Sequence, residues 1–221
     1  MKADLLGHSI VVVGLFPPSV FHPIWFTTND LLRESDVKGA NIDLLTNDVV
    51  FWHTERISFS AQNDRFSISS SFSDLFPMIR DLAINIILLF PQVPIFQLGM
   101  NYDIHEYFKK GNDWQSIRTN FFNSPLLDTI LESQRIESIR FSTLREYDDT
   151  PGKIIITIEP SVRIEPGFYM GINDHYELIK NRTSRELNSN TVADLIAKKW
   201  ALSQKWCTDF SLKFFEGIYA K

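Results

Sequence analysis

The chain has 221 residues, of which 44% are hydrophobic and 13% are aromatic. This composition is enough for a substantial core, which excludes a disordered chain, and the length fits one large domain or two small ones. The formal net charge of -5 gives the protein no overall attraction to nucleic acid or to an anionic membrane, so neither partner is indicated.

The only cysteine is Cys207, which excludes an intramolecular disulfide and a zinc site built from cysteines. A catalytic thiol needs a nearby histidine, and no histidine lies closer in the sequence than His175. We therefore expect Cys207 to be a buried apolar side chain on a helix.

Neither apolar run of the sequence has the pattern of a targeting or membrane segment. The N-terminal run is interrupted by Asp4, Gly14 and Pro17, and no small-residue cleavage site follows it. The run 82–90 contains Asn85 and is about half as long as a bilayer span. These features predict a cytoplasmic protein without a membrane span.

The first predicted elements are a strand and an aromatic segment. The β-branched run 9–15 is typical of a buried strand. Prolines in the next segment, 16–26, disfavour regular structure, whereas its large aromatic side chains are costly to leave in water. We expect an irregular segment packed onto the core, and the alternative is an exposed patch that contacts a partner. The aromatic side chains concerned are Phe21, Trp25 and Phe26.

A short helix over 29–34 and a hairpin are predicted next. Residues 49–60 alternate between apolar and polar, and the alternation resumes over 65–69. The intervening Asn63-Asp64 pair suits a type I′ turn, because both residue types tolerate positive φ. We expect one strand on each side of this turn, with Val49, Phe51, Ile57 and Phe59 on one face.

A central helix and a long strand follow the hairpin. Apolar residues recur with the helical period over 74–90, and Pro91 ends the helix. Residues 94–108 then alternate as in a half-buried strand. Its apolar face holds Leu98, Met100, Tyr102 and Ile104, and its polar face holds Gln97, Asn101, Asp103 and His105.

The second half of the chain predicts a short helix beginning at Ser124-Pro125 and then three strands. The strands are expected over 136–147, 153–159 and 168–179. Because tight turns join them, they must be antiparallel neighbours.

The last predicted element is a helix over about 192–218, roughly 40 Å long. It carries too much aromatic bulk for a solvated helix, so it must pack on a sheet face or a partner. We expect a second copy or a partner to cover Trp206 and Leu202 at its edge. The predicted buried stripe is Ile196, Trp200, Ser203, Cys207, Phe210 and Phe214.

These elements predict a single α+β domain over 1–221. Its antiparallel sheet should have roughly six to eight strands, packed by the long C-terminal helix and the central helix. No repeat or low-complexity segment divides the chain.

Two polar clusters are the candidates for chemistry. Asp103 and His105 share a strand face next to Glu106, so they suit a divalent metal or an acid–base pair. The alternative is the ordinary solvated face of a strand. Asp174 lies on an otherwise apolar strand face, and a carboxylate there needs either a structural partner or a function.

Three segments carry a resemblance to a known family: Leu98-Gly99-Met100-Asn101-Tyr102, Gly171-Ile172-Asn173-Asp174, and Asp209 to Phe214. With the order of the elements, they make the chain similar to a sporadically distributed bacterial family of uncharacterised proteins. That family has arginines around the glycine-containing strand, where Gln97 and Asn101 stand here. The resemblance implies no particular activity.

The sequence contains no complete catalytic motif and predicts no cofactor and no metal site. We therefore expect a non-catalytic protein-binding or assembly subunit of a bacterial multi-protein system, which also self-associates. Its binding residues would be Phe21, Trp25, Phe26 and Trp206. The alternative is a metal-dependent hydrolase or nuclease that uses Asp103, His105 and Asp174, which requires these three side chains to converge.

Overall fold

The computed structural model describes residues 4–109, 114, 117, 136–145, 150–178 and 189–219. The strands are β1 (Leu5–Gly14), β2 (Asn41–Leu45), β3 (Val49–His53), β4 (Ser58–Gln62), β5 (Arg65–Ser70), β6 (Ile95–Tyr107), β7 (Ile139–Thr143), β8 (Gly152–Pro160) and β9 (Gly167–Glu177). The helices are η1 (Pro18–Val20), α1 (Pro23–Thr28), α2 (Glu34–Val37), η2 (Ser73–Leu75), α3 (Phe76–Leu89) and α6 (Ser189–Tyr219).

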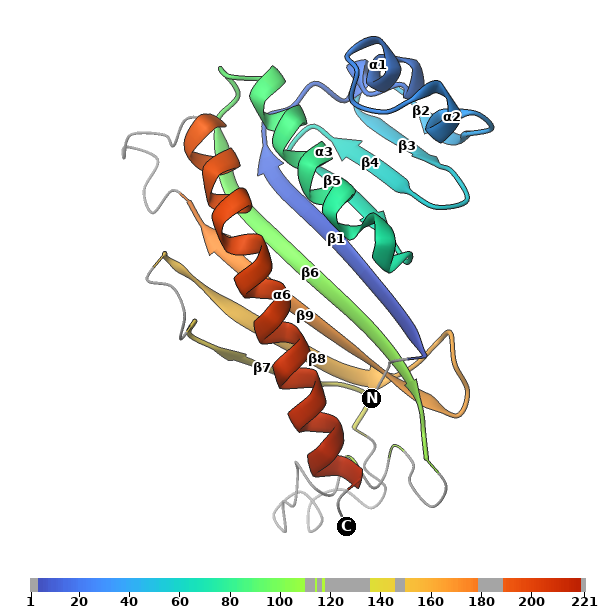
Figure 1. Ribbon diagram of the computed structural model, residues 1–221, viewed down its shortest axis with the longest axis vertical. Coiled ribbons are helices and arrows are strands. Elements are labelled where there is room, and N and C mark those ends of the chain that lie inside the picture. Colours follow the sequence, from blue (N-terminus) through green and yellow to red (C-terminus); the bar gives the residue numbers. More distant parts are fainter. Residues whose placement is uncertain are drawn as a thin grey trace.

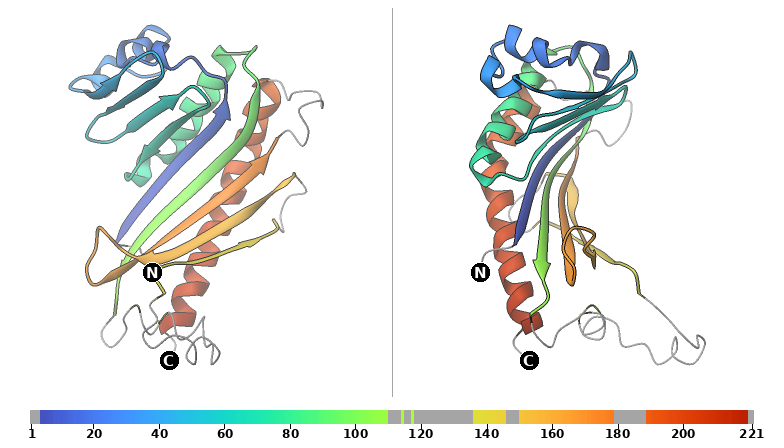
Figure 2. Two further views of the ribbon diagram at one scale, coloured as in Figure 1. Left: turned by 180° about the vertical axis from the view of Figure 1, so that it is seen from behind. Right: turned by 90° about the vertical axis from the view of Figure 1, so that its right-hand side faces the viewer.

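The described strands form one antiparallel sheet in the order β2-β3-β4-β5-β1-β6-β9-β8-β7. The long helices α3 and α6 lie side by side on one face of this sheet (Figure 1). Figure 2 shows the opposite face, over which no described helix lies. We call this second surface the open face. Its central residues are Gly7, Ser9, Asn101, Asp103, Tyr169, Gly171 and Asn173.

The apolar side chains of the strands point toward the helices and form the core. Ile10 and Val12 of β1 are fully buried, and they face α3 and α6 together with Leu98 of β6. A second group of buried residues, which includes Ile156 and Ile172, packs under the C-terminal half of α6. The α+β class, the central helix, the C-terminal helix and the long strand are confirmed, but the sheet has nine strands instead of six to eight.

The additional strands come from residues 41–62. The segment expected as one strand over 49–60 is two, β3 and β4, because Thr54 turns the chain between them. The Thr54 hydroxyl oxygen accepts hydrogen bonds from the amides of Arg56 (3.2 Å) and Ile57 (3.1 Å). This turn puts Phe51 and Phe59 on opposite faces, where they had been predicted to share one.

The hairpin at Asn63-Asp64 is confirmed, since Gln62 pairs with Arg65 across it. The turn is not type I′, because Asp30 is the only described non-glycine residue with positive φ.

The proline-rich segment 16–26 is more regular than predicted. Pro23 occupies the first position of α1, where its missing amide proton costs no helical hydrogen bond. His22 caps this helix through Nδ1, which accepts a hydrogen bond from the amide of Ile24 (3.1 Å). The short helix expected over 29–34 is replaced by α1 and α2, and the predicted helix start at Ser124-Pro125 lies outside the described residues.

The buried stripe of α6 departs from the prediction beyond Cys207. It continues through Ser211 and Phe215, whereas Phe210 and Phe214 are only half-buried. The stripe winds slowly around the helix because α6 follows a twisted sheet. Among the described residues, no helix is both long and apolar enough to span a membrane.

The two tryptophans near the middle of α6 provide a test of this packing. Trp200 is 3% exposed and stacks on the His8 ring at 4.4 Å, while Trp206 is half-buried. We expect Trp200→Ala to lower the free energy of unfolding by about 3–5 kcal/mol because it leaves a core cavity. Trp206→Ala should cost less than half as much. Urea denaturation of both variants measures this, and equal losses would contradict the observed orientation of α6.

His8 provides a second test, because its ring is 3% exposed between α6 and Phe76. Burial lowers the pKa of His8 to about 3. The unfolded chain therefore binds a proton near pH 6.5, where the folded chain does not. Folding stability should fall as the pH drops from about 6.5 toward 3, by up to about 1.4 kcal/mol per pH unit from this group.

The variant His8→Phe isolates this contribution, because it keeps an aromatic ring at the site and removes the titration. The difference in unfolding free energy between the variant and the natural chain should shift in favour of the variant as the pH falls. Parallel stability curves from pH 7 to pH 4 would contradict the burial of a neutral His8.

Candidate functional site

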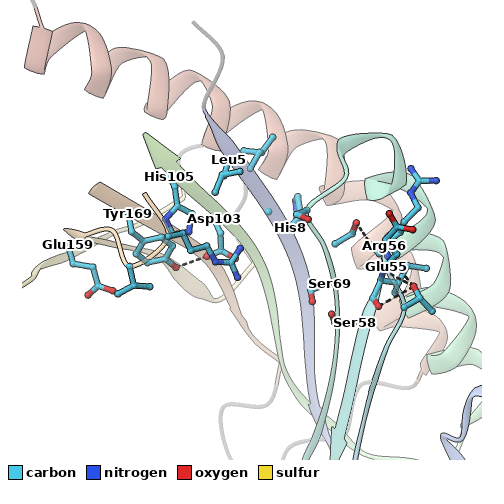
Figure 3. A pocket seen from close by; sticks show the side chains of 18 of the residues that line it. Leu5, His8, Glu55, Arg56, Ser58, Ser69, Asp103, His105, Glu159 and Tyr169 are labelled. Carbon is cyan, nitrogen blue, oxygen red and sulfur yellow. Dashed lines mark hydrogen bonds between the residues drawn. The ribbon is translucent and has the colours of Figure 1, made fainter. Parts of the chain in front are cut away.

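Two adjoining hollows lie on the open face and share Asp103 and Tyr169 in their lining. The larger is a groove of about 490 Å³ that runs from the β8–β9 connection to the turn between β3 and β4. In Figure 3 Glu159 and Tyr169 lie toward one end, Glu55 and Arg56 toward the other, and Asp103 and His105 between. The second hollow, of about 430 Å³, lies over β6, β8 and β9. Together they form the candidate site.

Strand pairing lines the site with small polar side chains. One row crosses seven strands, and its members, all polar except Ile155, lie next to each other because they are register partners. The row is Ser58, Ser69, Ser9, Asn101, Asn173, Ile155 and Ser142. Within it, the Asn101 amide donates to the Ser9 hydroxyl at 3.1 Å. Because most of these side chains are short, they extend little above the backbone of the sheet, and a ligand can approach the backbone closely.

The Tyr169 ring lies along the strand over Gly171. A β-carbon at Gly171 would stand only 2.3 Å from the Tyr169 hydroxyl, so any other residue at this position would displace the Tyr169 side chain. The Tyr169 hydroxyl donates to Oδ1 of Asp103 at 2.5 Å. Burial, followed by the charge of Asp103, raises the pKa of Tyr169, so the phenol keeps its proton at neutral pH. Among the described residues, no donor contacts the other oxygen, Oδ2 of Asp103.

His105 is held in one tautomer by Ser161. The Ser161 hydroxyl oxygen accepts hydrogen bonds from the amides of Arg163 (3.1 Å) and Ile164 (3.0 Å), which use both of its lone pairs. Its proton must therefore go to Nδ1 of His105, at 2.8 Å. The neutral imidazole then carries its own proton on Nε2, which makes this nitrogen a hydrogen-bond donor.

The surroundings of His105 oppose its protonation. Burial lowers the pKa of His105, and the nearby Arg163 lowers it further, against a smaller opposite effect of Asp103. A charged imidazole would also point a proton at the Ser161 hydroxyl, which already donates to that nitrogen. His105 is thus a fixed neutral donor, and its side chain is only 6% exposed at the groove.

The three candidate catalytic residues do not converge. Asp103 and His105 lie together on the open face, as predicted, and His105 is too buried to belong to an ordinary solvated strand face. Asp174 lies on the opposite, helix-covered face, opposite Met100, and it is fully buried. Glu106 also points to the helix side. Within the described part of the chain, no group of three His, Cys, Asp or Glu residues is arranged to hold a metal ion.

Asp174 has the structural partners that its apolar surroundings predicted. Its carboxylate accepts hydrogen bonds from Nε of Arg145 (2.5 Å) and from the Tyr176 hydroxyl (3.0 Å). Arg145 also lies over the Tyr176 ring at 3.6 Å and donates to the carbonyls of Thr150 and His175. This buried network ties the β7–β8 connection to β9.

The aromatic side chains predicted to bind a partner mostly belong to the core. Phe21 and Phe26 are fully buried against Phe59, so the exposed-patch alternative is corrected for both. Trp25 is half-buried and stacks on Phe90 at 5.8 Å. Trp206 stacks on Phe210 at 5.2 Å along the flank of α6. Phe21 and Phe26 are buried because they pack against Trp52 of β3 and Phe59 of β4, which removes their large apolar surface from water.

Sequence reasoning missed Tyr169, Gly171, Ser161 and Arg163. Tyr169 and Gly171 alternate with the apolar positions of β9, and that signal alone places them on the polar face. Ser161 and Arg163 follow β8 without a local pattern, and only the pairing of β6 with β9 brings them to His105.

Comparison with protein-family models and with curated protein sequences finds no match for this chain. The resemblance to a sporadically distributed bacterial family therefore stays a prediction.

The buried Asp174–Arg145 pair can be tested with a double-mutant cycle. We expect Asp174→Ala to lower the free energy of unfolding by about 3–5 kcal/mol, because it leaves the buried Arg145 guanidinium without its counter-ion. The double variant Arg145→Met/Asp174→Leu should lose less than the sum of the two single variants. As a control, Asp103→Asn on the open face should change stability little. Additive losses would contradict the coupling.

Proposed function

We propose that this protein is a non-catalytic binding subunit that holds a segment of another protein on the open face of its sheet. It would act in the cytoplasm as part of a bacterial multi-protein assembly. The observation that carries the proposal is the groove across the open face, where small polar side chains and fixed hydrogen-bonding groups line a surface over which no described helix lies.

The shape of the groove favours a segment of a protein over a small molecule. Its lining comes from β1, β4, β5, β6, β8 and β9, so it runs across six neighbouring strands of the sheet. Small-molecule sites are concave and enclose most of their ligand. A groove that crosses a sheet and presents hydroxyls and amides instead matches an extended chain with its own polar backbone.

The chemistry of the site favours binding over catalysis. A general base needs a free lone pair toward its substrate, but Nε2 of His105 carries a proton and Nδ1 accepts one from Ser161. One oxygen of Asp103 accepts the Tyr169 hydroxyl, and Asp174 lies on the other side of the sheet. The hydrolase or nuclease alternative has no geometric support here. Self-association through Trp206 and Leu202 stays a prediction.

The proposal is tested by blocking the open face. In the double variant Ser69→Tyr/Thr157→Tyr, two bulky polar side chains would cover the open face without removing a charge. The control Ala197→Tyr/Ala201→Tyr places the same side chains on the exposed side of α6. Each tagged protein is used to capture partners from a lysate of the source organism, with quantification by mass spectrometry.

We expect at least one protein to be enriched equally by the natural chain and the control, and at least tenfold less by the open-face variant. Equal recovery by all three proteins, or no enriched protein at all, would contradict the proposal. Melting temperatures of the three proteins verify that they are equally folded.

A further inference from the structure

The ionisable side chains of the groove leave an excess of negative charge. Its lining includes the carboxylates Glu55, Asp103 and Glu159 and the guanidinium groups of Arg56 and Arg163. Arg56 is already neutralised, because it forms an ion pair with Asp74 and packs over the Phe72 ring. Within the described ranges, none of the three carboxylates has an ion-pair partner. They therefore outnumber the one cation that remains, Arg163.

The carboxylates are spread along the groove, so they do not form a compact metal-type cluster. Asp103 belongs to β6, Glu159 belongs to β8, and Glu55 lies in the turn that leads into β4. Adjacent strands are about 4.8 Å apart and successive residues of a strand about 3.3 Å apart. Glu159 lies two strands and two residues away from Asp103, which is roughly 12 Å, and the turn with Glu55 lies three strands away on the other side, which is roughly 14 Å. The whole path of about 26 Å corresponds to roughly eight residues of extended chain.

Neutral donors stand between these charges. Nε2–H of His105 has no acceptor among the described residues. His105 is only 6% exposed and lines the groove, so this donor is largely shielded from water. The hydroxyls of Ser58 and Ser69 line the same groove. These groups need acceptors, which the carbonyls of a peptide backbone supply and a simple polyamine lacks. An anionic nucleic acid would be repelled by the carboxylates.

From this charge pattern we infer that the groove binds an extended peptide segment with basic side chains spaced about four residues apart, which places them all on one side of the segment. One basic side chain pairs with Oδ2 of Asp103, and the outer two pair with Glu159 and Glu55. Backbone carbonyls of the segment accept from His105. This inference rests on the proposed function, since it names the chemistry of the partner that the open face holds.

Two labelled nonapeptides of equal composition test the spacing. One carries lysines at positions 1, 5 and 9 in a Gly/Ser background, and the other carries them at positions 1, 2 and 3. Fluorescence anisotropy at low ionic strength measures binding to the full chain. We expect the spaced peptide to bind at least fivefold more tightly, because only its charges reach all three carboxylates. Equal affinity would show attraction to the acidic protein as a whole and would overturn the inference.

Variants test the central contact. Asp103→Asn keeps an acceptor for the Tyr169 hydroxyl and removes the charge, so it should weaken binding of the spaced peptide about tenfold. Asp194→Asn removes an exposed charge on α6 and should change affinity less than twofold. Equal effects of the two variants would overturn the inference. If both peptide tests fail while the open-face tyrosine variant still loses its partner, only the inference fails, and the proposed function stands.

Discussion

The constraint on which the rest of this structure depends is that the two long helices cover one face of a wide antiparallel sheet (Figure 1), while no described helix lies over the other (Figure 2). Side chains alternate strictly along each strand, so every apolar residue buried under α3 and α6 has a neighbour that points to the open face. The register then aligns these neighbours across strands, as it does for Ser69, Ser9 and Asn101. The polar surface is thus a geometric consequence of the way in which the core is buried.

The same constraint separates the residues of the core from those of the proposed binding surface within single strands. In β9, Asp174 and Tyr176 point into the core and hold Arg145, while Tyr169 and Asn173 line the open face. In β6, Met100 and Ile104 are buried and Asp103 and His105 line the groove. Because neighbouring residues serve opposite faces, one face can change in sequence without disturbing the packing on the other. This independence suits the proposed role, in which a partner binds to the polar open face.

Some of the site was predictable from local patterns. Alternation in the strand 95–107 places Asp103 and His105 on one face, and a carboxylate on an apolar face such as Asp174 requires a buried partner. The identity of that partner was not predictable, because Arg145 precedes Asp174 by 29 residues and reaches it only through the pairing of β8 with β9. The tautomer of His105 depends in the same way on Ser161, 56 residues further along the chain.

The sequence by itself determined the elements that have a strong local period: the strand 95–107, the helix 76–89, the helix 189–219 and the alternation within each strand. Only the tertiary structure decided which aromatic side chains form the core, on which side of the sheet Asp174 lies, and where Tyr169 meets Asp103. The physical reason is that a period is a property of consecutive residues, whereas these contacts depend on strand order and register. A one-residue change in register would move every side chain of a strand to the other face.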